Sequence, residues 1–142
     1  MNPAIFSLIG LVVGAVLQFF FTRHLDSKKH QRELRSKAYS DYLQCVSEHA
    51  NMGHLKNTSE ARQLGAKTAD AKARISLYAG PGVIVAFAAF ERLGATMNTD
   101  EQCDSFIEMV AAMRQDSLGD SSVANADLQA VVLGVRRDKV PA

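Results

Sequence analysis

Cys45 and His49 are the two residues whose types and spacing come closest to those of a metal-binding or catalytic pair. They are four residues apart, so on a helix they share a face, where a thiolate and an imidazole could ligate a metal ion or form a nucleophile–base pair. His54 or Cys103 would be the next ligand to consider. The sequence shows no partner that would orient the base or form an oxyanion site. Since both residues also fall on an apolar helical seam, we expect packing roles, with no catalytic residue and no metal or other cofactor.

Other motifs that carry chemistry are missing from the sequence. It contains no Gly-rich phosphate loop, no Cys-x-x-Cys and no His-Glu-x-x-His pattern, and Asp116 and Asp120 lack the spacing of a calcium loop. The net charge of +1 over 142 residues is not that of a nucleic-acid-binding protein. We therefore expect a non-enzymatic protein, with neither a nucleic acid nor a small-molecule substrate among its partners.

The element that must position everything else is the run from Pro3 to Thr22, which contains no Asp, Glu, Lys or Arg. A helix of this length spans about 30 Å, the thickness of the hydrocarbon core of a bilayer. A cleaved signal peptide would carry positive charge before its apolar core and small residues after it. Here Phe19, Phe20 and Phe21 end the run and Arg23 follows it, so we expect an uncleaved transmembrane anchor rather than a signal peptide or a buried helix.

Basic residues directly after this run set the expected orientation. The segment 22–40 has an excess of four positive charges, because its only acidic residues are Asp26 and Glu33. Lys and Arg beside a span stay on the cytoplasmic side and are attracted to anionic lipid. We expect the N-terminus outside an inner (plasma) membrane and the remaining chain in the cytoplasm. The basic residues expected at the membrane surface are Arg23, Lys28, Lys29, Arg32, Arg35 and Lys37.

One face of the expected span carries small and polar residues: Ser7, Gly10, Gly14 and Gln18. Gly10 and Gly14 form a small-xxx-small pattern, which lets two helices approach closely, and Gln18 would favour a hydrogen-bonding neighbour over lipid. This face predicts helix association, with a second copy or with another membrane protein.

The rest of the chain shows helical periodicity. No Pro or Gly interrupts residues 23–52, so the anchor helix is expected to continue there, with a heptad-like, coiled-coil type of seam at Ala38, Tyr42, Cys45, His49 and Met52. A second helix, about 60–79, has a similar seam at Ala61, Leu64, Thr68, Ala71, Ile75 and Tyr78. Two such seams predict a closely packed antiparallel hairpin. Ser59 or Thr58 should cap the second helix, and Gly80 should end it.

Three further helices are expected after Gly80. Residues 81–93 are apolar almost all round, which predicts a central core helix; insertion into a membrane surface would need a Lys/Arg-rich face, which is missing. Thr99 and Gln102 have the form of a capping box for a helix reaching about Leu118. Its inward residues should be Phe106, Ile107, Val110 and Met113. Its acidic residues Asp100, Glu101, Asp104 and Glu108 form either a solvated face or a face for a partner.

A last short helix is expected from about Ala126 to Leu133, capped by Asn125 and Gly134, with Leu128, Val131 and Val132 towards the core. The fold class is therefore all-α: one N-terminal transmembrane helix that continues into a small antiparallel bundle of four to five helices. The expected organisation is an anchor at 1–22, a basic juxtamembrane helix at 23–36, a cytoplasmic bundle at 37–135 and a tail at 136–142.

Three stretches carry a resemblance to a group of proteins: Lys37-Ala38-Tyr39-Ser40-Asp41-Tyr42-Leu43, Ala73-Arg74-Ile75-Ser76-Leu77-Tyr78-Ala79-Gly80-Pro81 and Met113-Arg114-Gln115-Asp116. In these the chain resembles uncharacterised bacterial single-span membrane proteins with a small helical cytoplasmic domain. The resemblance implies no activity and no functional residue.

The function expected from these features is that of a membrane-anchored helical interaction module, self-associating or an accessory subunit of a membrane complex. Its partners would be the lipid bilayer and either further copies of itself or another membrane protein. The alternative is an effector whose transmembrane helices assemble and perturb the bilayer when a signal clusters the cytoplasmic domain.

Overall fold

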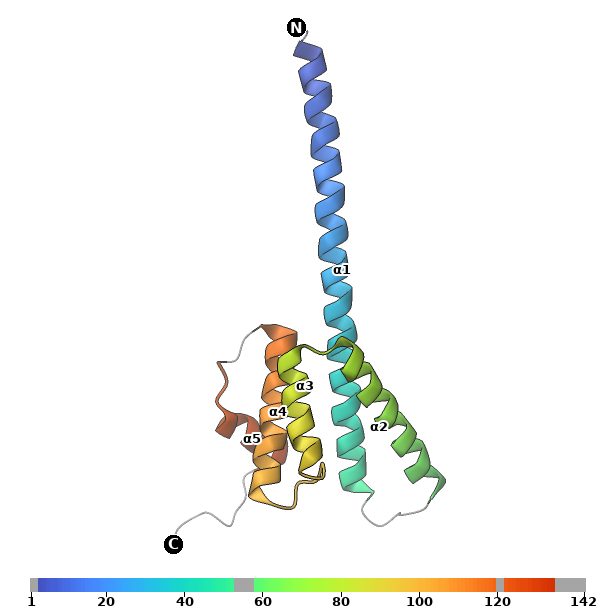
Figure 1. The fold of residues 1–142 in the computed structure, drawn as a ribbon, viewed down its shortest axis with the longest axis vertical. Coiled ribbons are helices and arrows are strands. Elements are labelled where there is room, and N and C mark those ends of the chain that lie inside the picture. The colour runs from blue at the N-terminus through green and yellow to red at the C-terminus, as the bar shows by residue number, and fades with distance from the viewer. Residues whose placement is uncertain (1–2, 53–57, 120–121, 135–142) are drawn as a thin grey trace. The chain divides into compact units, whose positions relative to one another are not determined.

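The computed structural model describes residues 3–52, 58–119 and 122–134, with side chains described from residue 10 onward. Within these residues every regular element is a helix, so the all-α class is confirmed there. The helices are α1 (Pro3–Asn51), α2 (Ser59–Tyr78), α3 (Pro81–Arg92), α4 (Asp100–Leu118) and α5 (Asn125–Leu133) (Figure 1).

The chain forms two compact units, Met1–Leu34 and Arg35–Ala142. The first unit is the N-terminal part of α1, whose described side chains from Gly10 to Glu33 are all exposed. Among the residues described, no helix carries an apolar stretch long enough to cross a bilayer. The side chains of the first seven residues of the expected span, 3–9, lie outside the described part.

The second unit is a helical bundle with one apolar core. Tyr42 of α1 packs edge-on against Phe87 of α3, with ring centroids 4.9 Å apart, and Phe90 of α3 lies 5.3 Å from Phe106 of α4. Such aromatic pairs contribute about 0.5–1.5 kcal/mol beyond their buried area. The core residues are Ala38, Tyr39, Tyr42, Ala71, Ile75, Val83, Phe87, Phe90, Phe106, Ile107, Met109 and Met113. As expected, α3 contributes to the core, through a buried face of Val83, Phe87 and Phe90, but it is not buried all round, because Val85 is 69% exposed.

Several expected helix ends are confirmed. Thr58 caps α2 by accepting a hydrogen bond from the Ala61 backbone N–H. Thr99 and Gln102 form the capping box of α4, which satisfies backbone donors that the helix start would otherwise leave without a partner. Gly119 ends α4 in the left-handed region, at φ 73°, where a side chain would be strained.

The expected close hairpin of α1 and α2 is wrong. The helix pairs that approach most closely are α3 with α4 and α4 with α5. The seam of α1 packs instead on α3, through Tyr42 and Phe87, and α2 diverges from α1 towards its N-terminal end (Figure 1). The two helices are connected by an ion pair between Arg74 and Asp41, with 2.8 Å between Nη1 and Oδ2.

The expected details of α5 are partly wrong. Asn125 is the first helical residue rather than the cap, Val131 is 83% exposed, and Val132 is also exposed. Leu128 and Leu133 pack against the core instead. A nine-residue helix that lies against α4 buries one narrow face, so its remaining apolar residues stay on the surface.

Candidate functional site

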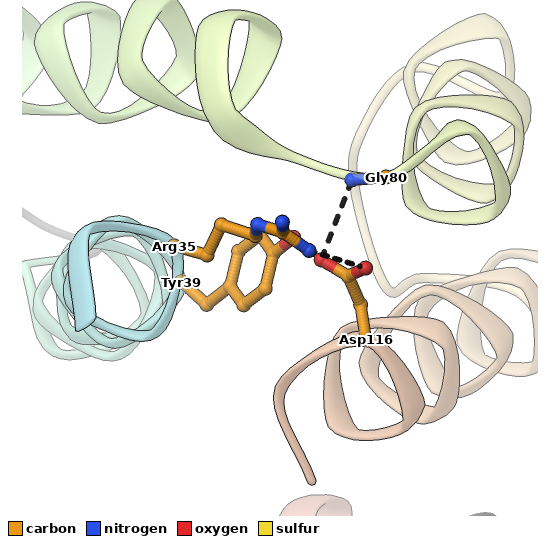
Figure 2. A network of polar contacts seen from close by, with 4 residues as sticks. All are labelled: Arg35, Tyr39, Gly80 and Asp116. Carbon is orange, nitrogen blue, oxygen red and sulfur yellow. Dashed lines mark hydrogen bonds and ion pairs between the residues drawn. The ribbon is translucent and has the colours of Figure 1, made fainter. Parts of the chain in front are cut away.

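Asp116 of α4 is the polar centre of the bundle unit. Its Oδ1 lies 3.1 Å from Nη1 of Arg35, its Oδ2 accepts a 2.6 Å hydrogen bond from the hydroxyl of Tyr39, and the same oxygen lies 3.3 Å from the backbone nitrogen of Gly80. Figure 2 shows these four residues, which we call the Asp116 node. The node connects α1, the junction of α2 with α3, and the last turns of α4.

Gly80 is in the node because a side chain does not fit there. The sequence predicts Gly80 as the C-terminal cap of α2, but the cap is Ala79, and Gly80 precedes α3 with φ of −68°, which any residue adopts. A Cβ at position 80 would lie 2.5 Å from Oδ1 of Asp116. The close approach of the carboxylate, not a left-handed backbone, explains the glycine.

The electrostatics of the node favour a neutral Tyr39. Burial raises the pKa of the Tyr39 hydroxyl well above its usual value, and the hydrogen bond to Asp116 raises it further. The side chains of Arg35 and Asp116 are only partly exposed, at 28% and 19%. All three donors point at one carboxylate, two of them at Oδ2 and one at Oδ1. The node therefore connects helices α1 and α4 and the junction of α2 with α3.

Cys45 and His49, which share a helix face by spacing, differ in burial in the structure. Cys45 is buried, as its seam position predicts, but His49 is exposed, so its expected packing role is wrong. The nearest polar atom to its Nε2 is the Thr68 hydroxyl at 3.4 Å, which is too long for a strong hydrogen bond. Within the described residues, no three His, Cys, Asp or Glu side chains are grouped to hold a metal ion. His54 lies outside the described residues.

Two hollows in the bundle unit contrast in polarity. A cleft of about 210 Å³ lies between α1 and α2 and is lined by Asp41, Gln44, Cys45, Glu48, Lys67, Asp70 and Arg74. In it Arg74 is bonded to both Asp41 and Asp70, so its guanidinium is occupied within the protein. An apolar hollow of about 280 Å³ is lined by Leu43, Val46, Ser47, Ala50, Met97, Phe106, Val110, Val132 and Leu133. It has no charged side chain among its lining residues.

The expected helix-association face is solvent-exposed where it is described. Gly10, Gly14 and Gln18 are exposed, and a Cβ placed on either glycine meets nothing within 4 Å. The side chain of Ser7 lies outside the described part. The face is thus without a partner within the described residues of a single copy.

Most of the charged residues expected to face a membrane or a partner are exposed. Arg23, Lys28, Lys29, Arg32 and Lys37 are exposed, whereas Arg35 is part of the Asp116 node. The acidic residues Asp100, Glu101, Asp104 and Glu108 are exposed on α4.

Sequence reasoning did not identify Tyr39, Gly80 and Asp116 as one cluster. They are 77 residues apart at the extremes, and no periodicity links them. Each of the three stretches on which the expected resemblance rests contains one of these residues. The structure brings those three stretches together at the Asp116 node.

No protein-family model, no curated protein and no solved structure matches the chain.

Proposed function

We propose that this chain is a non-enzymatic, membrane-anchored helical interaction module. In this account residues 3–22 cross the inner (plasma) membrane once, with the N-terminus outside, and the bundle unit lies in the cytoplasm. There it binds protein partners, among them a second copy of the same chain. The anchor restricts the bundle to the inner surface of the membrane, so the contribution of the chain is to position its partners.

The observation that carries the proposal is the exposed apolar surface of α1. From Leu11 to Phe21 every large apolar side chain is about half exposed or more, and Leu11 reaches 71%. Burying one such side chain contributes about 1.5–3 kcal/mol, so water is an unfavourable surrounding for a helix of this kind. Lipid would cover all sides of it at once. The proposed span also includes residues 3–9, on the basis of their sequence.

The direction of insertion rests on charge. Arg23, Lys28, Lys29 and Arg32 directly follow the apolar run and are exposed. Basic residues remain on the cytoplasmic side and bind anionic headgroups there. This arrangement supports a cytoplasmic bundle unit.

Self-association rests on the two open glycines. Because nothing lies against Gly10 and Gly14, a second helix could approach their backbone closely, and Gln18 on the same stripe could hydrogen-bond across the contact. Larger side chains at the glycines would keep the two helices apart.

The test is the mass of the full-length protein in detergent, measured by light scattering with co-purifying proteins identified. We expect a defined homo-oligomer that becomes monomeric in Gly10→Ile/Gly14→Ile. The matched control is Val12→Ile/Val16→Ile, which has the same spacing on the other side of the helix and should leave the oligomer intact. An oligomer that survives the glycine substitutions would refute the interface.

Two other results would replace the proposal. A one-to-one complex with a different membrane protein would make the chain an accessory subunit. A collapse of membrane potential on expression that disappears in Gln18→Leu would favour the membrane-perturbing effector, whose spans assemble around Gln18.

A further inference from the structure

Large apolar side chains are exposed at one end of the bundle unit. Leu77 is 75% exposed at the end of α2, Val85 is 69% exposed near the start of α3, and Leu118 is 61% exposed as the last residue of α4. Tyr78 and Ile84 are 37% exposed beside them in the chain. We call these five residues the apolar end. The other exposed large apolar residues of this unit, within the described part, are Val131 and Val132 of α5.

The Asp116 node shows that these three helix ends are neighbours. Gly80 lies between Tyr78 and the first turns of α3, and its backbone N–H is bonded to Asp116, two residues before Leu118 (Figure 2). In Figure 1, α2 ends, α3 begins and α4 ends at the same end of the bundle. Exposed apolar residues on three neighbouring helix ends indicate an interaction surface, whereas single scattered ones need no explanation.

The same end is richer in basic than in acidic side chains. Within about two helical turns of the node, the bundle unit has five basic residues, Arg35, Lys37, Lys72, Arg74 and Arg114, and three acidic ones, Asp41, Glu108 and Asp116; Glu33 directly precedes the unit. Two of these acids are engaged in ion pairs, Asp116 with Arg35 and Asp41 with Arg74, whereas Glu33 and Glu108 are exposed. Lys72 is bound to Glu91. Lys37 and Arg114 have no ion-pair partner among the described residues, and the Nε of Arg114 has no acceptor there.

The N-terminal end of α4 is acidic, in contrast to its apolar and basic C-terminal end. Asp100, Glu101 and Asp104 occupy its first two turns and are exposed. The bundle unit is therefore polarised along α4, with acids at one end and apolar and basic side chains at the other. An anionic lipid surface repels the first end and attracts the second.

The order of the chain also favours the apolar end as the end of the bundle unit that meets the membrane. Arg35 begins the bundle unit at the node, and residues 23–34 with their excess of basic side chains directly precede it in the sequence. If residues 3–22 are held in a bilayer, the apolar end is the end of the bundle that the chain tethers most closely to it.

We propose that the apolar end docks on the surface of an anionic bilayer. Leu77, Val85 and Leu118 enter the interfacial region, and Lys37 and Arg114 bind headgroup phosphates. This inference deepens the proposed function and rests on it, because the membrane that anchors the chain is also the surface that the bundle recognises. The acidic start of α4 is then directed away from the membrane and is available to other proteins.

The test uses the absence of tryptophan from the sequence. Val85→Trp and Leu118→Trp each introduce a single fluorophore into the apolar end, and Val131→Trp places one on the exposed surface of α5 as the control. Each full-length variant is reconstituted into vesicles of phosphatidylcholine and phosphatidylglycerol, with and without brominated acyl chains, which quench tryptophan on contact. Flotation of the same vesicles measures membrane attachment.

We expect the emission at positions 85 and 118 to shift to the blue and to be quenched several-fold more strongly than at position 131. In vesicles of phosphatidylcholine alone, or with Lys37→Glu/Arg114→Glu added, this quenching should fall by at least half. Vesicles that float while positions 85 and 118 remain unquenched would overturn the docking but leave the anchor intact. Failure of the chain to float would overturn the proposed function itself. A blue shift without quenching by brominated lipid would assign the apolar end to a protein partner and contradict lipid docking.

Discussion

Tyr39 of α1 donates a 2.6 Å hydrogen bond to Oδ2 of Asp116 near the end of α4. The bond joins the first helix of the bundle unit to the fourth across 77 residues. Its donor is 4% exposed, so losing the acceptor would leave a buried hydroxyl without a partner. Because Arg35 and the Gly80 backbone use the same carboxylate, the node fixes three chain segments relative to one another.

Asp116→Ala should destabilise the bundle by about 2 kcal/mol, chiefly because it leaves the Tyr39 hydroxyl buried and unpaired; the partly exposed Arg35 pair adds less. For a domain of this size the midpoint of thermal unfolding should fall by about 10 °C. Circular dichroism of the full-length chain measures it. Asp104→Ala, an exposed acid on the same helix, is the control and should change little. Equal midpoints for the two variants would mean that the node contributes nothing to stability.

Tyr39→Phe should destabilise the bundle at neutral pH, and this loss of unfolding free energy relative to the wild type should shrink at high pH. At neutral pH the wild type is more stable by about 1–2 kcal/mol, through the hydrogen bond to Asp116. The pKa of Tyr39 is raised in the folded state, mainly by burial, so the neutral tyrosine stabilises the fold fully below the unfolded pKa of about 10. Above that pH the unfolded tyrosine ionises, and the wild type loses about 1.4 kcal/mol per pH unit from this group.

Denaturant unfolding of wild type and Tyr39→Phe between pH 7 and pH 11.5 measures this difference. Tyr42 is common to both proteins, and burial raises its pKa as well, so its contribution cancels in the comparison. The gap in unfolding free energy should narrow as the pH rises above 10. A gap that stays constant or widens would show that Tyr39 is not held neutral by the fold.

Gly80→Ala should destabilise the bundle by about 1–3 kcal/mol, since the new Cβ would lie 2.5 Å from Oδ1 of Asp116 and push the carboxylate out of the node. Gly82→Ala is the control: its Cβ meets nothing within 4 Å, and alanine in the first turn of α3 should stabilise the helix slightly. In the double variant Gly80→Ala/Asp116→Ala, the two costs should be less than additive, because the clash disappears with the carboxylate. Strict additivity would contradict the proposed contact.

Thr99→Ala should cost about 1 kcal/mol, because the Thr99 hydroxyl accepts a hydrogen bond from the backbone N–H of Gln102 at the start of α4. Thr96→Ala, in the loop before it, is exposed and serves as the control. Urea unfolding of both variants gives the comparison. A Thr99 variant as stable as the Thr96 variant would mean that the capping box is not formed in solution.

The features that the sequence predicted correctly are determined by residues close to one another in the chain. The helix of residues 81–92, the capping box at Thr99 and the end of α4 at Leu118 follow from local periodicity and cap chemistry. These features need no knowledge of the partner helix, so the residues themselves predict them.

What the sequence could not predict depends on which helices meet. The seams on α1 and α2 predicted a close hairpin, but Tyr42 packs on Phe87 of α3. A heptad-like pattern shows that a helix has an apolar face but does not specify which helix packs against it. His49 continues the seam by spacing, yet it is exposed near the end of α1. Val131 is apolar and exposed because α5 buries only one narrow face. Asp116 becomes central only when three distant segments are folded together.

The measurement that tests the central claim most directly is alkaline carbonate extraction of membranes from bacterial cells that express the full-length chain. If residues 3–22 cross the bilayer, as proposed, the chain stays in the membrane pellet. The account also predicts that Val12→Arg/Val16→Arg, which places two charges in the proposed span, moves the chain into the supernatant. Release of the unmodified chain by carbonate would contradict the anchor, and with it the proposed role of the bundle as a membrane-held interaction module.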